Sequence, residues 1–150
     1  MTGSLITALV SIAVSFAMLV LVVLTPTLVW DQLALMTVAQ NAARVAAITQ
    51  STQAVQQEIQ TDLTAEHLPT TYNGQTLFTL TNLQVTTSPT GYAVAGGPAS
   101  TNATVTIQYD APLPFFRALT LFGGSALPAT MTMTQTASYF NETQYTGAGA

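Results

Sequence analysis

The feature that most constrains this chain is a long apolar run near its N-terminus. No ionisable side chain occurs from Leu5 to Trp30, and Pro26 is the one proline of the run. About 20 apolar residues, at roughly 1.5 Å each, span a bilayer core of about 30 Å. Thr and Ser hydroxyls within the run can bond back to the helix backbone and do not oppose burial. The run therefore predicts a helix that crosses a membrane or lies in the apolar core of an assembly.

Two other interpretations of the run are weaker. A buried helix of a globular core is usually shorter than this run, and charged residues would flank it. A cleaved secretory signal carries a basic segment ahead of a short apolar segment, whereas Met1 to Ser4 include no basic residue. A membrane or assembly helix remains the prediction.

The composition supports an embedded or assembled protein. Only 5% of the 150 residues are charged, against roughly 25% in ordinary soluble proteins, and 49% are hydrophobic. Such a chain lacks the charge that normally keeps a monomer in solution. The net charge is −4, and the only basic residues, Arg44 and Arg117, cannot supply the cationic surface that nucleic-acid binding requires. We therefore expect no nucleic-acid partner.

The helical pattern continues beyond the apolar run. From Asp31 to Leu63 the chain contains no Gly and no Pro, and apolar residues recur at helical spacings among Gln, Thr and Asn. The pattern predicts one continuous helix from about Leu5 to about Leu63, with a narrower apolar face in its second half that packs on a sheet. Pro26 removes one backbone donor, so we expect a kink or a locally melted stretch from Val22 to Pro26.

The remainder of the chain is typical of a Thr-rich β head. Alternating patterns over 76–85, 102–110 and 130–140 predict antiparallel strands. The segment Tyr72-Asn73-Gly74-Gln75 predicts a turn. A short strand over 92–95 and a short helix over 115–122 are also expected. The predicted fold class is α+β, a long N-terminal helix followed by a small antiparallel sheet, with an apolar half-helix at 1–30, an amphipathic continuation of that helix at 31–66 and the β head at 67–150.

Residues with catalytic or metal-binding chemistry do not form a recognisable pattern. His67 is the only histidine and there is no cysteine, which excludes a metal site built from nitrogen and sulfur ligands. Glu58, Asp62 and Glu66 recur every four residues, but a solvated helix face is favoured over a cation site because no loop of closely spaced oxygen ligands is present. No phosphate loop, dinucleotide glycine pattern or nucleophile elbow occurs. We predict no enzyme activity, no catalytic residue, no metal and no cofactor.

Two sequons are present in the predicted head. Asn102-Ala103-Thr104 and Asn141-Glu142-Thr143 make Asn102 and Asn141 candidate N-glycosylation sites if the head is exported. Sequons also arise by chance, and the alternative is that both asparagines carry no glycan.

The order of these parts resembles the type IV pilin superfamily. The closest similarity is to the TadE/TadG-like pilins, through the segments Gly3 to Val10 and Asp31 to Ala47, the second of which ends in the stretch N-A-A-R-V-A-A. The segments from Ala103 to Pro114 and from Thr130 to Tyr139 are similar to the closing strands of that group. The resemblance implies a subunit that polymerises through its helix into an extracellular filament at the cell surface. It also implies a single-pass stage in inner-membrane lipid before assembly, and the pilus assembly machinery as a partner.

One departure from the family bears on assembly. Pilins commonly carry a glutamate near position 5, and TadE-like chains have it where this chain has Thr7; no acid precedes Asp31. A buried N-terminal amine would then rely on hydroxyls or backbone carbonyls, which compensate less well than a carboxylate. No cleavable leader is recognisable, so Met1 is expected to be either the first residue after processing or the start methionine.

Assembly of the filament would use one set of positions on the apolar helix. The small residues Ala8, Ser11, Ala13, Ser15 and Ala17 would let neighbouring helices approach closely. Identical copies related by a rotation that does not close form a helical polymer. The residues expected to build the helical core are Leu5, Ala8, Ile12, Ser15, Leu19, Val22 and Pro26.

Two other functions remain open. The first is a minor pilin or TadE-like assembly component that stays anchored in the membrane in few copies. The second is a membrane-tethered binding module whose head recognises a surface ligand through aromatic side chains. Those aromatics are more often core residues, because several occupy alternating strand positions; they are Tyr72, Phe78, Tyr92, Tyr109, Phe115 and Phe116.

Overall fold

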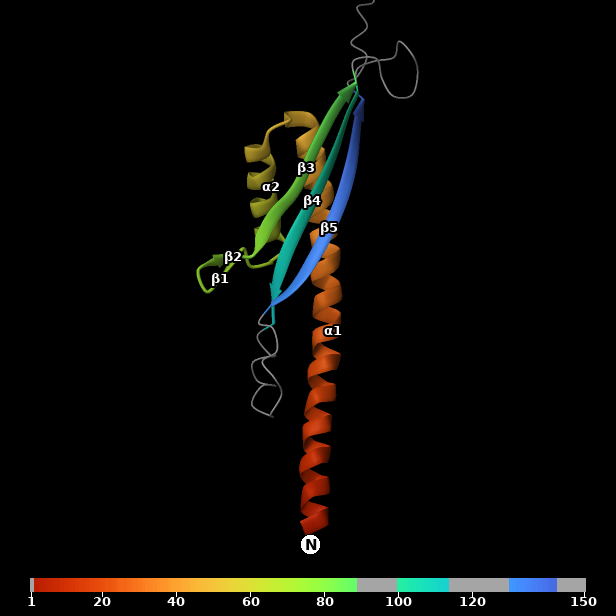
Figure 1. The fold of residues 1–150 in the computed structure, drawn as a ribbon, viewed down its shortest axis with the longest axis vertical. Coiled ribbons are helices and arrows are strands. Elements are labelled where there is room, and N and C mark those ends of the chain that lie inside the picture. Colours follow the sequence, from red (N-terminus) through yellow and green to blue (C-terminus); the bar gives the residue numbers. More distant parts are fainter. Residues whose placement is uncertain (1, 89–99, 114–129, 143–150) are drawn as a thin grey trace, which may run out of the picture.

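The computed structural model describes residues 2–88, 100–113 and 130–142. A long helix is followed by a small antiparallel sheet, which confirms the predicted α+β fold class (Figure 1). The strand expected over 92–95 and the helix expected over 115–122 lie outside the described residues. The elements are α1 (Thr2–Thr49), α2 (Thr52–Ala65), β1 (Thr71–Tyr72), β2 (Gln75–Thr76), β3 (Phe78–Ser88), β4 (Ser100–Pro112) and β5 (Thr130–Glu142).

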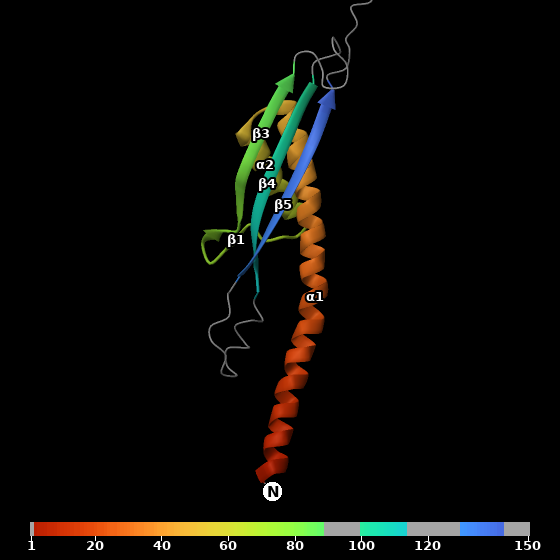
Figure 2. The same cartoon turned by 45° about the vertical axis from the view of Figure 1, so that its right-hand side comes forward.

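Helix α1 passes through Pro26 without interruption, so the expectation of local melting from Val22 to Pro26 is wrong. Proline cannot donate to the carbonyl four residues earlier. On either side of it, the Thr25 and Thr27 hydroxyls donate to carbonyl oxygens of the preceding turn, at 2.7 and 2.8 Å respectively. These bonds give additional hydrogen-bond donors to the carbonyl oxygens of Leu21 and Leu24, close to the position where Pro26 lacks an N–H. Figure 2 shows α1 as one continuous, curved helix.

The prediction of a single helix reaching Leu63 is wrong, because α1 ends at Thr49 and α2 turns back along it. Gln50 has a φ of 54°, the left-handed conformation that commonly ends a helix. Ser51 then caps α2, its side chain accepting a hydrogen bond from the Ala54 backbone N–H at 3.4 Å. The two helices are antiparallel neighbours (Figure 1). The amphipathic part of the chain is thus a helical hairpin that belongs to the head.

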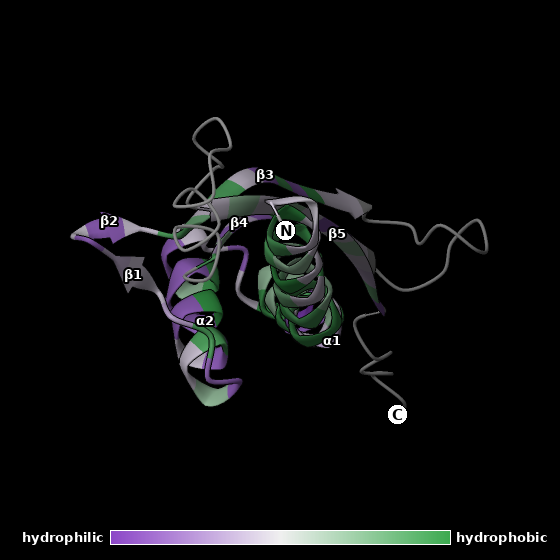
Figure 3. Ribbon diagram, turned by 90° about the horizontal axis from the view of Figure 1, so that it is seen from below, coloured by the Kyte–Doolittle hydropathy of each residue, from purple (hydrophilic) through white to green (hydrophobic). Residues whose placement is uncertain are grey.

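The sheet has the order β3-β4-β5, with both pairs antiparallel. Strands β4 and β5 extend beyond their predicted ranges, whereas β3 begins and ends later than the predicted 76–85. Strand β3 contains one irregularity, between Leu80 and Asn82. Figure 3 shows the sheet as an arc over the helices, with α1 beneath β4 and β5 and α2 on the β3 side. The turn predicted at Tyr72–Gln75 is confirmed. It joins β1 to β2 through Asn73 and Gly74, both at positive φ, as a two-residue hairpin requires.

The core lies between the inner face of the sheet and the two helices. Along β4 the inward positions are fully buried, as the alternating pattern predicted. Four alanines of α1 let the helix approach the sheet and α2 closely: Ala39, Ala42, Ala43 and Ala46. Burying each large apolar side chain contributes about 1.5–3 kcal/mol. The largest side chains in this core are Leu35, Val38, Val55, Ile59, Leu63, Val105, Ile107 and Tyr109.

Candidate assembly surface

The structure places the predicted assembly residues on one face of α1 that the described head does not cover. They are spaced alternately by three and four residues, which aligns them along one side of a helix. Ala8, Ser15 and Pro26 are exposed as well. The large side chains of the set are Leu5, Ile12, Leu19 and Val22, which are 65%, 65%, 62% and 66% exposed.

The opposite face of α1 is where the head packs. Val20 and Leu24 are buried against Leu113, which follows β4, with Leu28 beside them. Two residues along a helix correspond to a rotation of about 200°. Val22 and Pro26 therefore point away from the side that Val20 and Leu24 bury. The head thus covers α1 from one side only.

The uncovered face extends past Asp31, beyond the residues predicted from the sequence. Val29, Leu33 and Met36 continue the same spacing and are 52%, 58% and 48% exposed. Their neighbours two positions on, including Leu35 and Val38, are buried in the head. A seven-residue period through the apolar run and beyond was the signal that could have found them. We call the whole set the open face: Leu5, Ala8, Ile12, Ser15, Leu19, Val22, Pro26, Val29, Leu33 and Met36.

The open face ends where its spacing reaches a polar residue and then a buried one. Gln40, at the next position of the repeat, is exposed and polar, and Ala43 after it is fully buried. Among the small residues expected to allow close helix approach, Ala13 is partly buried and lies seven residues before Val20, on the head side. Ala8 and Ser15 remain on the open face.

Among the described residues, α1 is the one helix long and apolar enough to cross a membrane. Its apolar run is almost entirely exposed, which is the state of a helix surrounded by lipid or by other copies rather than by its own head. Trp30, at the end of the run, is 67% exposed. Tryptophan is enriched at membrane interfaces, so its position suits the boundary between lipid and water.

A small pocket of about 290 Å³ lies where α1 meets the foot of the head. Asp31, His67 and Tyr109 all line it. The Tyr109 hydroxyl donates to the backbone carbonyl of Pro69 at 3.0 Å. Burial raises the pKa of the Asp31 carboxyl, and burial together with the Asp31 charge raises the pKa of the Tyr109 hydroxyl. Tyr109 therefore stays protonated as a structural hydrogen-bond donor.

The acidic stripe on α2 is accounted for in part by contacts within the head. Asp62 accepts a hydrogen bond from the Asn41 side-chain amide at 2.9 Å, which joins α2 to α1. Glu58 is half-buried on the same helix, and Glu66, also half-buried, is its C-cap residue. Within the part of the chain that the structure describes, no group of three or more His, Asp or Glu side chains could hold a metal ion.

The two candidate glycosylation sites lie on different strands. Asn102 is exposed on β4, opposite Thr86 and Phe140. The hydroxyl of Thr104, which completes its sequon, lies 2.9 Å from that of Ser138. Asn141 is half-buried on β5, and its sequon ends beyond the described residues. Glycosylation of either asparagine stays a prediction.

The aromatic residues considered for ligand binding divide into two groups. Tyr109 is fully buried, while Tyr72 and Phe78 pack against the core as partly buried side chains. Tyr92, Phe115 and Phe116 lie outside the described residues. The exposed aromatics of the described head are instead Tyr139 and Phe140, neighbours on β5 whose side chains point to opposite faces of the sheet.

Comparison of the chain with protein-family models, with curated proteins and with solved structures gives no significant match. The resemblance to TadE/TadG-like pilins therefore rests on the sequence segments that carry it.

Proposed function

We propose that this protein is a structural subunit that assembles with copies of itself into a type IV pilus-like filament at the cell surface. The observation that carries the proposal is the open face of α1. It runs from Leu5 to Met36 and contains no charged residue, and its large side chains are 48–66% exposed. Parallel helices with apolar or small residues at alternating spacings of three and four pack side by side through those positions.

The upper end of the open face favours a protein partner over lipid alone. Before assembly, lipid would cover the apolar run up to about Trp30, as a single-pass anchor. Leu33 and Met36 lie beyond Asp31, where water would meet them if nothing else did. Contact with another copy removes the apolar surface of these two side chains from water. Lipid would not cover them, because they lie beyond the apolar run.

The shape of the subunit suits a polymer with helices inside and sheets outside. The sheet covers the side of α1 away from the open face (Figure 3). Copies in one membrane share one orientation, so a rotation about an axis along the helices turns open faces inward and sheets outward. If this rotation does not close, the copies form a filament. Ala8 and Ser15 allow close contact between helices in its core.

The proposal is tested by electron microscopy of filaments sheared from expressing cells. Leu33→Asp adds a charge to the open face outside the apolar run, so membrane insertion is unaffected and filament formation is expected to be lost. Gln32→Asp is the matched control, since the adjacent exposed Gln32 lies off the open face. Filaments in both variants would contradict the proposal.

One observation favours a second candidate, a membrane-anchored minor pilin or TadE-like assembly component. No acid occurs on the open face, so a neighbour's N-terminal amine would find no carboxylate in a tightly packed core. A component present in few copies would not bury its N-terminal amine in such a core, so it would avoid this free-energy cost. It predicts native protein in the detergent-extracted membrane fraction and no fibre in which this chain is the main band.

A further inference from the structure

The outer edges of the sheet are long, and Glu142 at the end of β5 is the one charged residue of the two edge strands. No described strand pairs with the outer side of β3 or of β5. Natural proteins usually protect such edges with lysine, proline or a bulge. Strand β5 pairs with β4 without irregularity from Thr130 to Glu142, and it contains no Lys, Arg or Pro. No described strand therefore covers the outer side of β5, where a strand of another copy can pair.

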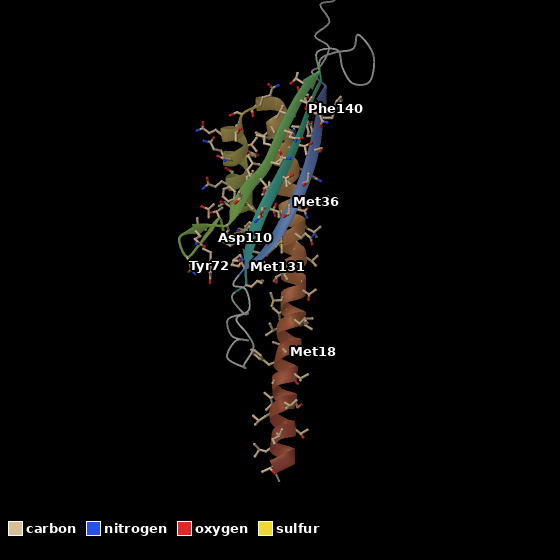
Figure 4. The ribbon with its side chains drawn as sticks, viewed as in Figure 1. Met18, Met36, Tyr72, Asp110, Met131 and Phe140 are labelled. Carbon is tan, nitrogen blue, oxygen red and sulfur yellow. The ribbon has the colours of Figure 1, made fainter. Side chains whose placement is uncertain are left out.

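Exposed apolar side chains of the head gather on this same strand. The large hydrophobic residues that are exposed in the described head beyond α1 are Met131, Tyr139 and Phe140, which are 46%, 37% and 44% exposed. All three belong to β5, and Figure 4 shows Met131 and Phe140 near its two ends. Met131 and Tyr139 point to the inner face of the sheet, as the alternation along β5 requires. They stay exposed because β5 is an edge strand. A neighbouring layer would bury them.

The other edge of the sheet offers a matching surface. Strand β3 has no charged residue, and it is regular from Asn82 to Ser88, after its bulge. Inside this edge, a groove of about 460 Å³ separates α2 from β3. Half-buried Phe78 and Leu80 line it together with the amide side chains of Gln53, Gln56, Gln57 and Gln60. Uncharged amides and apolar side chains can accept the inward-facing residues of an added strand.

We propose that β5 of one copy pairs with the edge of β3, from Asn82 to Ser88, in a second copy, so that the sheets of neighbouring subunits join. Strands β3 and β5 run in the same direction, since each is antiparallel to β4. Copies anchored in one membrane share that direction, so the new pairing is parallel. At equal height Tyr139 of one copy lies beside Val85 of the next, because both are level with Ala103 within a copy.

This contact deepens the proposed function, on which it rests, by giving the assembly a second interface. The open face of α1 joins the helices on the inside, and the β5 and β3 edges join the heads on the outside. Both contacts are satisfied by the same rotation about an axis along α1. Because the contact uses two different edges, each copy can bind one neighbour on either side, and the pairing propagates.

Cysteine cross-linking tests the contact directly, because the chain has no native cysteine. Gln84→Cys is combined in turn with Thr134→Cys, Thr136→Cys and Ser138→Cys, all exposed positions on the outer side of the sheet. Within one copy, β3 and β5 are two strand spacings apart, roughly 9.6 Å, beyond the reach of about 7 Å for a disulfide. After mild oxidation of native membranes or filaments, at least one pair is expected to give a ladder of covalent oligomers.

The single variants and a charge variant complete the test. A dimer from Ser138→Cys alone would indicate β5 against β5 and overturn the assignment to β3. Tyr139→Lys places a charge opposite Val85 of the neighbouring copy and is expected to abolish the ladder, whereas Gln108→Lys adds the same charge on central β4 and keeps it. No ladder from any double variant overturns the proposal. Filaments without a ladder would reject the edge contact alone, and a ladder without filaments would reject the filament alone.

Discussion

The two halves of α1 have the same secondary structure but differ in how their side chains are buried. In the half that the head encloses, alanines alternate with a few large residues, and their side chains from Leu35 to Ala46 on the inner side are fully buried. In the N-terminal half, large branched residues such as Ile12 and Val22 are more than 60% exposed. The enclosed half is complete within one chain, whereas the projecting half is a surface that needs lipid or other copies.

The largest expected difference between the two halves is the loss of head stability when a core side chain is truncated. Ile107→Ala removes a fully buried side chain of β4 and is expected to cost about 2–5 kcal/mol of head stability. Leu19→Ala on the open face should leave head stability unchanged within about 0.5 kcal/mol. Denaturant unfolding of the full chain in detergent measures both. Equal losses would show that the projecting half is part of the folding unit.

A smaller effect is expected at the reversal between the helices. Ser51→Ala removes the cap of α2 and should cost about 0.5–2 kcal/mol. Thr52→Ala, one residue further and exposed, serves as its control and should change the stability little. The same unfolding experiment measures both variants. No loss with Ser51→Ala would mean that packing alone positions α2.

A comparable effect is expected where the head meets the projecting half. Tyr109→Phe removes the hydrogen bond to Pro69 while keeping the ring, and should cost about 0.5–1.5 kcal/mol. Since the hydroxyl keeps its proton, the loss should be the same at pH 6 and pH 8. A loss that changed between these values would show that Tyr109 titrates there.

The smallest expected effect is a pH dependence from Asp31. Burial raises the pKa of this carboxyl in the folded head above its value in the unfolded chain. Protonation is therefore more favourable in the folded state, and this group's contribution is fully present at acidic pH and lost as pH rises through the folded pKa. Asp31→Asn should remove that loss, so its stability should fall less than that of the native chain from acidic to neutral pH. An unchanged pH profile would contradict a buried carboxyl.

The sequence predicted those parts of the fold that simple periodicity specifies. The absence of charge up to Trp30 predicted the projecting helix, and alternation along 102–110 predicted the buried face of β4. The reversal at Gln50 was missed because the hairpin depends on a left-handed residue and a serine cap, and neither interrupts the helical spacing on either side. Ser51 was the available local signal.

The candidate surface was predicted only in part for a similar reason. Leu5 to Pro26 were recognised because they lie in the apolar run. Leu33 and Met36 share their spacing, but they follow the first acid of the chain, and helices α1 and α2 were taken as one rod with a single buried side. Which side of α1 the head covers depends on contacts with residues more than 50 positions away, such as Leu113, and spacing alone does not specify it.

The most direct measurement of the central claim is the reactivity of a single thiol on the open face before and after assembly. Leu33→Cys should react quickly with a maleimide in the detergent-solubilised monomer and become protected in sheared filaments. Gln108→Cys, on the outer face of the central strand β4, places a single thiol away from both proposed interfaces and should react in both states. If Leu33→Cys stays fully reactive in filaments, copies do not meet through the open face, and the account of assembly given by α1 is wrong.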